Sequence, residues 1–203
     1  MSHRPGSVTL VCLAGLLCAA SGCAPIGPLV GIIAPPKVHA LYKPKKRPMA
    51  VLVENALKGG SQASADRLAA LLTQELQEHD VAPMVDVARI LELRSRDPAA
   101  FRNMPMTRIA REVGAAQLLY VRITQAAGGV VDPADTDATL EARVRIVDAK
   151  TGQTLWPPHE SHLIAYQVSN PEMVRASPEL REQLIAGLAA SIAGLFYTRV
   201  ADQ

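Results

Sequence analysis

The most constraining feature of this 203-residue sequence is a strand, turn and return strand between residues 139 and 156. From Thr139 to Val147, apolar and polar side chains alternate, as in a strand with one buried and one solvated face. The turn-forming run Asp148–Gly152 (DAKTG) follows, and Gln153–Trp156 resumes strand character. The segment therefore predicts an antiparallel hairpin.

Weaker patterns on either side of the hairpin complete an α/β (α+β) order of elements. The expected elements are a strand over Pro48–Glu54, a helix from Ser64 to about His79, a short strand over Pro83–Val85, a helix capped by Asp86, a helix over Thr107–Val113 that ends at Gly114, an edge or half-exposed strand over Ala116–Thr124, the hairpin, a strand over Ser161–Val168 at an edge or bulge, and a helix from Ser177 toward Val200. They predict a mixed sheet of about four or five strands, with helices packed on one face and a C-terminal helix.

The composition excludes two classes of site. All three cysteines, Cys12, Cys18 and Cys23, lie in the first 23 residues, so the folded part has neither a disulfide nor a thiolate metal site. Lys and Arg number 21 against 19 Asp and Glu, and this near balance argues against a nucleic-acid partner.

The first 22 residues have the pattern of a signal peptide. A short polar start containing Arg4 precedes Val8–Ala20, whose 13 mostly apolar residues are fewer than the roughly 20 that span a bilayer. Small residues then lead to Cys23, a pattern that resembles the lipobox of bacterial lipoproteins, although Ala20 stands where Leu is usual. Ordinary cleavage with an incidental cysteine is the alternative. Acylation of Cys23 would anchor the mature chain, and Ala24 after it favours the outer membrane, facing the periplasm.

Residues 24–48 contain six prolines and no acidic residue, which is typical of an extended tether. Its basic end, Lys43 with Lys45, Lys46 and Arg47, contacts either anionic headgroups or only solvent. The predicted organisation is a lipoprotein signal peptide over 1–22, a lipidated cysteine and tether over 23–47, and one domain over 48–203.

Few residues carry chemistry, so we expect no catalytic residue, cofactor or metal. His159 and His162 point to opposite sides of an extended segment and have no third ligand nearby. The segment with Asp132, Asp135 and Asp137 resembles a calcium loop in its number of carboxylates. It lacks the central glycine and the closing glutamate of an EF-hand. The candidate interaction residues are these three aspartates, the basic residues Lys45, Lys46 and Arg47, and Trp156, for which a core position is the alternative.

Three segments resemble a group of bacterial envelope lipoproteins and periplasmic modules that share an α/β domain. They are Met49–Val53 (MAVLV), Val113–Val121 (VGAAQLLYV) and Ala142–Trp156 (ARVRIVDAKTGQTLW). The group includes the curli-secretion lipoprotein, the lipoprotein activators of penicillin-binding proteins, the amino-terminal domain of the Tol translocation protein and uncharacterised lipoproteins. The likeness covers roughly residues 48–200 and consists of structural motifs.

This resemblance implies an accessory or assembly lipoprotein that binds an envelope protein, alone or as an oligomer. The chain lacks the long barrel-forming segments of the curli pore and the propeller of the Tol protein. Two alternatives stay open: a structural link between membrane and cell wall through the basic tether, and a metal-dependent hydrolase that uses His159 and His162.

Overall fold

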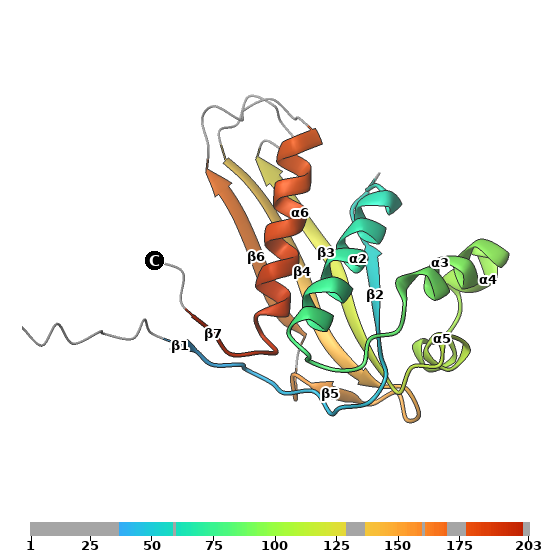
Figure 1. Ribbon diagram of the computed structural model, residues 1–203. Coiled ribbons are helices and arrows are strands. Elements are labelled where there is room, and N and C mark those ends of the chain that lie inside the picture. Colours follow the sequence, from blue (N-terminus) through green and yellow to red (C-terminus); the bar gives the residue numbers. More distant parts are fainter. Residues whose placement is uncertain (1–36, 59, 129–136, 160, 170–177, 201–203) are drawn as a thin grey trace, which may run out of the picture. The chain divides into compact units, whose positions relative to one another are not determined.

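The computed structural model describes residues 37–58, 60–128, 137–159, 161–169 and 178–200 (Figure 1). The strands are β1 (Lys37–Val38), β2 (Met49–Asn55), β3 (Gln117–Gly128), β4 (Asp137–Asp148), β5 (Thr154–Trp156), β6 (His162–Ser169) and β7 (Arg199–Val200). The helices are α2 (Gln62–Glu78), α3 (Val87–Arg96), α4 (Pro98–Arg102), α5 (Met106–Val113) and α6 (Pro178–Ala193).

A five-stranded mixed sheet forms the centre of the fold. Its order is β2-β3-β4-β5, and β6 also pairs with β4. The β2–β3 pair is parallel, while β4 is antiparallel to β3, β5 and β6. Residues 137–144 of β4 pair with β6 and residues 146–147 pair with β5, so these two strands follow one another along the same edge of β4. The α/β class and the mixed sheet are confirmed.

The predicted hairpin is present between β4 and β5. Asp148 closes its turn, because its carboxylate accepts hydrogen bonds from the backbone N–H groups of Lys150 and Thr151. Two predicted helix ends are also confirmed: Asp86 caps α3 by accepting from the N–H of Ala88, and Gly114 ends α5 in the left-handed region at φ 77°.

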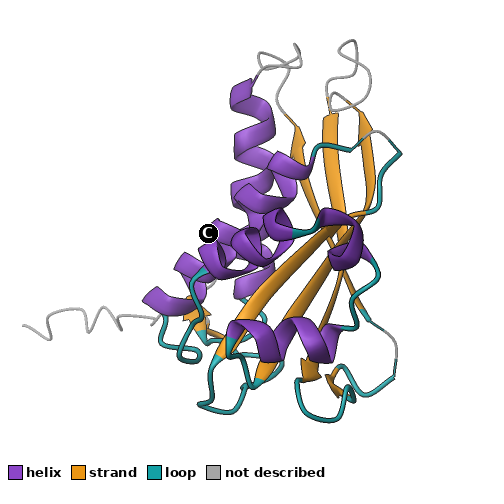
Figure 2. Ribbon diagram, turned by 90° about the vertical axis from the view of Figure 1, so that its right-hand side faces the viewer, coloured by secondary structure: helices purple, strands orange, loops and turns teal. Residues whose placement is uncertain are grey.

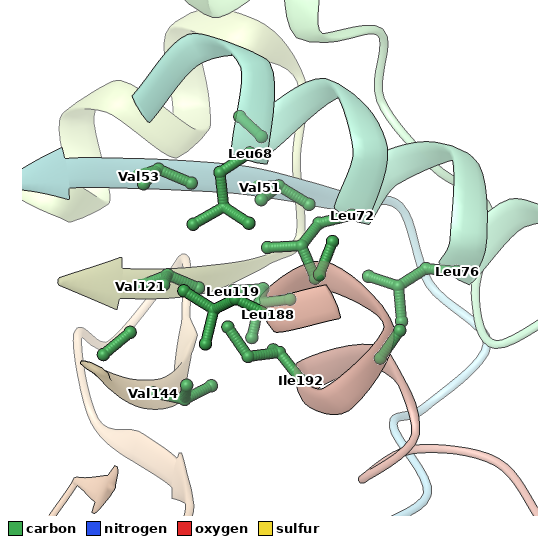
Figure 3. Close-up of a cluster of buried hydrophobic side chains, with 14 of the residues drawn as sticks. Val51, Val53, Leu68, Leu72, Leu76, Leu119, Val121, Val144, Leu188 and Ile192 are labelled. Carbon is green, nitrogen blue, oxygen red and sulfur yellow. The ribbon is translucent and has the colours of Figure 1, made fainter. Parts of the chain in front are cut away.

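The first face of the sheet is covered by α2 and α6, and the larger core lies there. Figure 3 shows Leu68 and Leu72 of α2 above Val51 and Val53 of β2, with Leu188 and Ile192 of α6 beside the neighbouring strands. Leu68, Leu72, Leu188 and Ile192 are fully buried. Their three- and four-residue spacing is what brings them onto one side of each helix.

The opposite face carries a second, smaller core under α3, α4 and α5, which face the viewer in Figure 2. Its sheet side chains are the alternate ones of β2 and β3, such as Leu52 and Leu118, and they meet Ile90 and Ile109 of the helices. The expectation of helices on one face is therefore wrong. The reason is that β2 and the first half of β3 are apolar at successive positions, as strands buried on both faces are. β3 is also a central strand and not an edge, because β2 pairs with one side of it and β4 with the other.

The C-terminal helix is shorter than the sequence predicts. α6 ends at Ala193, and its last turn tightens through bonds from the N–H groups of Leu195 and Phe196 to carbonyls three residues back. Within α6, Gly187 lies against the ring of Tyr166 from β6, where an added Cβ would clash with that ring. The glycine therefore lets α6 pack closely on β6.

The residues before β2 are packed on the domain. We call Lys37–Arg47 the strap. The N–H groups of Leu41 and Tyr42 both donate to the carbonyl of Leu195, and Pro44 is buried. The strap thus belongs to the same compact unit as the sheet, and the compact unit begins earlier than residue 48.

Candidate functional site

The predicted basic cluster lies at the end of the strap, where two of its three side chains form ion pairs. Lys46 Nζ lies 2.7 Å from a carboxylate oxygen of Asp80, and an Arg47 guanidinium nitrogen lies 3.3 Å from that of Asp148. Lys45 is exposed, and its carbonyl accepts a hydrogen bond from the Gln117 side chain at 2.8 Å. These contacts hold the strap against the domain.

Trp156 is 8% exposed and belongs to the larger core. Its ring lies 6.1 Å from that of Tyr42 in the strap, 5.5 Å from Phe196 and 5.3 Å from His162, measured between centroids. Trp156 therefore connects the strap, the chain after α6 and β6. This placement makes it an internal contact of the domain.

The other predicted residues are only partly placed. Cys23, Asp132 and Asp135 lie outside the described residues, and Asp137 opens β4. His159 precedes β6 and is exposed, whereas His162 is half-buried against Trp156, so the structure does not bring the two imidazoles to one point. Across the described ranges, no three His, Cys, Asp or Glu side chains gather closely enough to hold a metal ion.

The polar half of the second sheet face presents three arginines, one from β3 and two from β4. Arg122 of β3 lies directly opposite Arg143 of β4, and Tyr120 lies opposite Arg145. We call Arg122, Arg143 and Arg145 the arginine face. The strand alternation was visible in the sequence, but the register that places the three side chains together was not.

A small cavity of about 200 Å³ opens on the arginine face. Its lining consists of hydroxyl, imidazole and guanidinium side chains: Tyr120, Arg122, Arg143, Arg145, Thr154, His159 and Ser161. None of the three arginines forms an ion pair with a carboxylate of the described residues. The cavity therefore gathers three guanidinium groups, with the carboxylate of Glu54 opposite Arg122 in the β2–β3 register.

Arg145 is held in place by Tyr120. Its guanidinium carbon lies 4.9 Å from the centroid of the Tyr120 ring, and its Nη2 lies 3.7 Å from the sulfur of Met106. The Tyr120 hydroxyl donates a hydrogen bond to the Glu54 carboxylate. Burial, followed by this hydrogen bond, raises the pKa of Tyr120 to about 12. The Nε of Arg145 is buried without a hydrogen-bond partner, so the side chain has donor capacity to spare.

A second hollow of about 460 Å³ lies at the carboxyl ends of β2 and β3, beside the first turns of α2 and α6. Leu140, Leu184 and Ile185 give it an apolar floor, and Lys58 and Arg181 add positive charge. Its size suits a small apolar or amphiphilic group. None of the interaction residues predicted from the sequence lies in its wall.

Among the described residues, no helix combines the length and the apolar character needed to cross a bilayer. The geometry thus offers a cationic sheet face, an apolar hollow and a docked strap. Guanidinium groups bind carboxylate and phosphate oxygens through paired hydrogen bonds, so the arginine face can bind anions.

No family model matches the sequence, and comparison with curated proteins also gives no match. Among solved structures, a lipoprotein from Neisseria meningitidis is similar at 17% identity with a TM-score of 0.46, covering 73% of this chain and 99% of the other. A PelC dodecamer from Paraburkholderia phytofirmans is similar at 10% identity and a TM-score of 0.44, covering 79% and 97%.

The C-terminal domain of LpoB from Salmonella enterica is similar at 18% identity and a TM-score of 0.36, covering 64% of this chain and 84% of the other. Similarities of this size carry no argument about function. They do include lipoproteins of the kind that the sequence resembles.

Proposed function

We propose that this chain is a cell-envelope lipoprotein, anchored through an acylated Cys23, that serves as a non-catalytic binding or assembly module. The leader, the small residues before Cys23 and the lack of any later cysteine support the anchor. Ala24 after the cysteine supports the outer membrane, with the domain facing the periplasm.

The arginine face carries the binding role. Like charges placed directly across two strands destabilise a sheet, and Arg122 faces Arg143 in this way. Arg145 adds a third cation that lines the same cavity. An arrangement of like charges that costs stability is best explained by an anionic partner that binds between the guanidinium groups.

The surroundings favour a protein segment as that partner. Leu163 of β6 pairs with Arg143 in the strand register and is 49% exposed, so an apolar side chain lies next to the cations. In the described sheet β6 pairs only with β4, which leaves its other edge open to an added strand. We therefore assign the site to an acidic segment of another envelope protein.

In-cell photo-crosslinking tests this binding role. A photoreactive residue replaces Leu163, and the crosslinked partner is recovered from membranes. The double substitution Arg122→Gln and Arg143→Gln should lower the yield about tenfold or more, because two charge-assisted contacts are lost. The matched control is Arg102→Gln with Arg111→Gln, which removes the same charge from exposed positions on α4 and α5. Equal yields from the two double variants would refute the assignment.

The anchor is tested separately. Metabolic labelling with palmitate should label the wild-type chain, and Cys23→Ser should abolish the label and leave the leader attached. Intact-mass analysis that finds an unmodified thiol at the mature start would show that the anchor is absent, whatever the crosslinking experiment gives.

The structure also bears on the alternative of a membrane-to-wall link. Such a link needs free positive charge in the tether, but Lys46 and Arg47 form ion pairs with Asp80 and Asp148. Cell-wall pull-down that falls after neutralising Lys43, Lys45, Lys46 and Arg47 would favour the link over the binding module.

A further inference from the structure

The two ends of the described chain meet in a small ribbon beside the foot of α6. β1 and β7 pair antiparallel, with Lys37 opposite Val200 and Val38 opposite Arg199. Figure 1 shows this pair, in blue and red, apart from the central sheet. We call β1 and β7, together with Leu41 of the strap, the terminal ribbon.

The terminal ribbon exposes most of the large apolar side chains that the described surface shows. Among the described residues, four large apolar side chains are exposed. Three of them belong to the ribbon: Val38 at 41%, Leu41 at 61% and Val200 at 51%. The fourth, Leu163, lies on β6. An apolar group that stays exposed in a folded domain marks a contact surface when several occur together.

The two segments that carry these side chains have only positive charges. Neither the strap nor residues 193–200 contain an acidic residue, while Lys37, Lys43, Lys45 and Arg199 are exposed. Because neighbours in a strand pair share a face, Val38 lies with Arg199 and Val200 lies with Lys37. Each face of the ribbon thus combines one aliphatic side chain with one cation, a combination that suits the headgroup region of an anionic bilayer.

The ribbon is also fixed close to the proposed anchor. Only 13 residues separate Cys23 from Lys37, so a chain anchored at the cysteine keeps β1 within about 50 Å of the bilayer. Over so short a distance a weak affinity for the surface is enough to hold the ribbon there, because binding is intramolecular. The strap contacts through Leu195 and Trp156 would then fix the orientation of the whole domain.

We propose that the terminal ribbon docks the domain onto the anionic phospholipid surface to which the chain is anchored. This rests on the proposed lipoprotein function, and it assigns the membrane as a binding partner of the folded domain itself. A second copy of the chain fits this surface less well, since two two-residue strands bury far less than the roughly 800 Å² per partner of a stable interface.

The first experiment uses the mature chain beginning at residue 23 with Cys23→Ser, which carries no acyl group and no other cysteine. Leu41→Cys introduces one thiol for an environment-sensitive fluorophore. Gln74→Cys is the control, because Gln74 is exposed on α2 and lies outside both the ribbon and the arginine face. With vesicles containing about a quarter phosphatidylglycerol in phosphatidylethanolamine, the probe at position 41 should brighten and shift to the blue, and the probe at 74 should not.

The second experiment measures partition of unlabelled chains by co-sedimentation with the same vesicles. Replacing Lys37 and Arg199 by Gln, or Val38, Leu41 and Val200 by Ser, should each lower the partition coefficient about tenfold, and added salt should weaken the wild type. Arg102→Gln with Arg111→Gln, which removes the same charge from exposed positions on α4 and α5, should leave it unchanged, and circular dichroism reports whether each variant folds.

Equal probe responses at 41 and 74, or equal partition of the ribbon variants and of Arg102→Gln with Arg111→Gln, would overturn the proposal. So would concentration-dependent dimers that the ribbon variants lose, since the ribbon would then bind a second copy. None of these measurements involves the acyl chains. A failure here leaves the palmitate result standing, and a failure of palmitate labelling leaves these results standing.

Discussion

The two faces of the sheet are built from the same strands, but helices cover one face more completely than the other. On one face, α2 and α6 cover the strands with fully buried leucines and isoleucines. On the other, three short helices cover only β2 and the first half of β3, and the rest displays the arginine face. Stability is therefore concentrated on the first face, and the second combines a modest core with a surface on which three arginines lie side by side.

The largest difference is expected in how much a large-to-small substitution on each face lowers the free energy of unfolding. Leu188→Ala, at a fully buried site between α2 and the sheet, should lower the free energy of unfolding by about 3 kcal/mol. Ile109→Ala on α5 should cost about 2 kcal/mol, because an eight-residue helix at the margin of the sheet can shift into the space. Urea denaturation measures both values. Equal costs, or faster amide exchange in α6 than in α5, would mean that the faces do not differ in this way.

The next largest effect concerns the fully buried Gln117, whose Nε2 donates to the strap carbonyls of Lys45 and Arg47 at 2.8 and 3.2 Å. Gln117→Ala leaves both carbonyls without this donor and should cost about 2 kcal/mol. It should also speed tryptic cleavage after Lys45 and Lys46, as the strap is released. Gln153→Ala, at an exposed glutamine, is the control. Unchanged cleavage in Gln117→Ala would show that other contacts hold the strap.

A smaller, pH-dependent effect is expected at Tyr120 on the second face. Because its pKa is raised from 10.0 to about 12 in the folded protein, its contribution is complete below about pH 10 and is lost as the pH rises through 12. Tyr120→Phe removes the hydrogen bond to Glu54 and should cost about 1 kcal/mol at neutral pH. Between neutral pH and about pH 11, the free energy of unfolding measured with urea should fall less steeply in the variant than in the wild type. Identical slopes would contradict the perturbed pKa.

The smallest effect has the opposite sign. Arg143→Gln removes one of two like charges that face each other across β3 and β4, so it should stabilise the domain by about 0.3 kcal/mol. The same change should reduce partner crosslinking. A variant that is more stable but binds less would show that the arginine face serves binding at the expense of stability. A destabilised variant would show that the arginines already have partners within the fold.

Much of the fold could be predicted because it depends on local signals. The alternation of residues 139–147, the capping carboxylate of Asp86 and the C-terminal Gly114 each act over a few residues, and each is confirmed. The α4 helix, capped by the Asp97 carboxylate, was missed, since five residues give no periodic pattern. The second helical layer was missed because an apolar run does not tell whether one or both faces of a strand are buried.

The candidate site was less predictable for a related reason. The sequence shows Arg122, Arg143 and Arg145 at polar strand positions, but only the β3–β4 register brings them together. Likewise, residues 37–47 have a tether's composition, and their attachment depends on Gln117, Leu195 and Asp80, which are distant in sequence. Partners that lie far apart along the chain leave no short motif.

The parallel pairing of β2 with β3 has a consequence for how the chain is made. About sixty residues, 56–116, separate the two strands, whereas β3 and β4 are close neighbours in sequence. Synthesis delivers β2 first, yet closing so long a loop makes this the last pairing of the central sheet to form. Until then a strand of five buried residues lacks its neighbour, and this interval is when the nascent protein is most prone to aggregation.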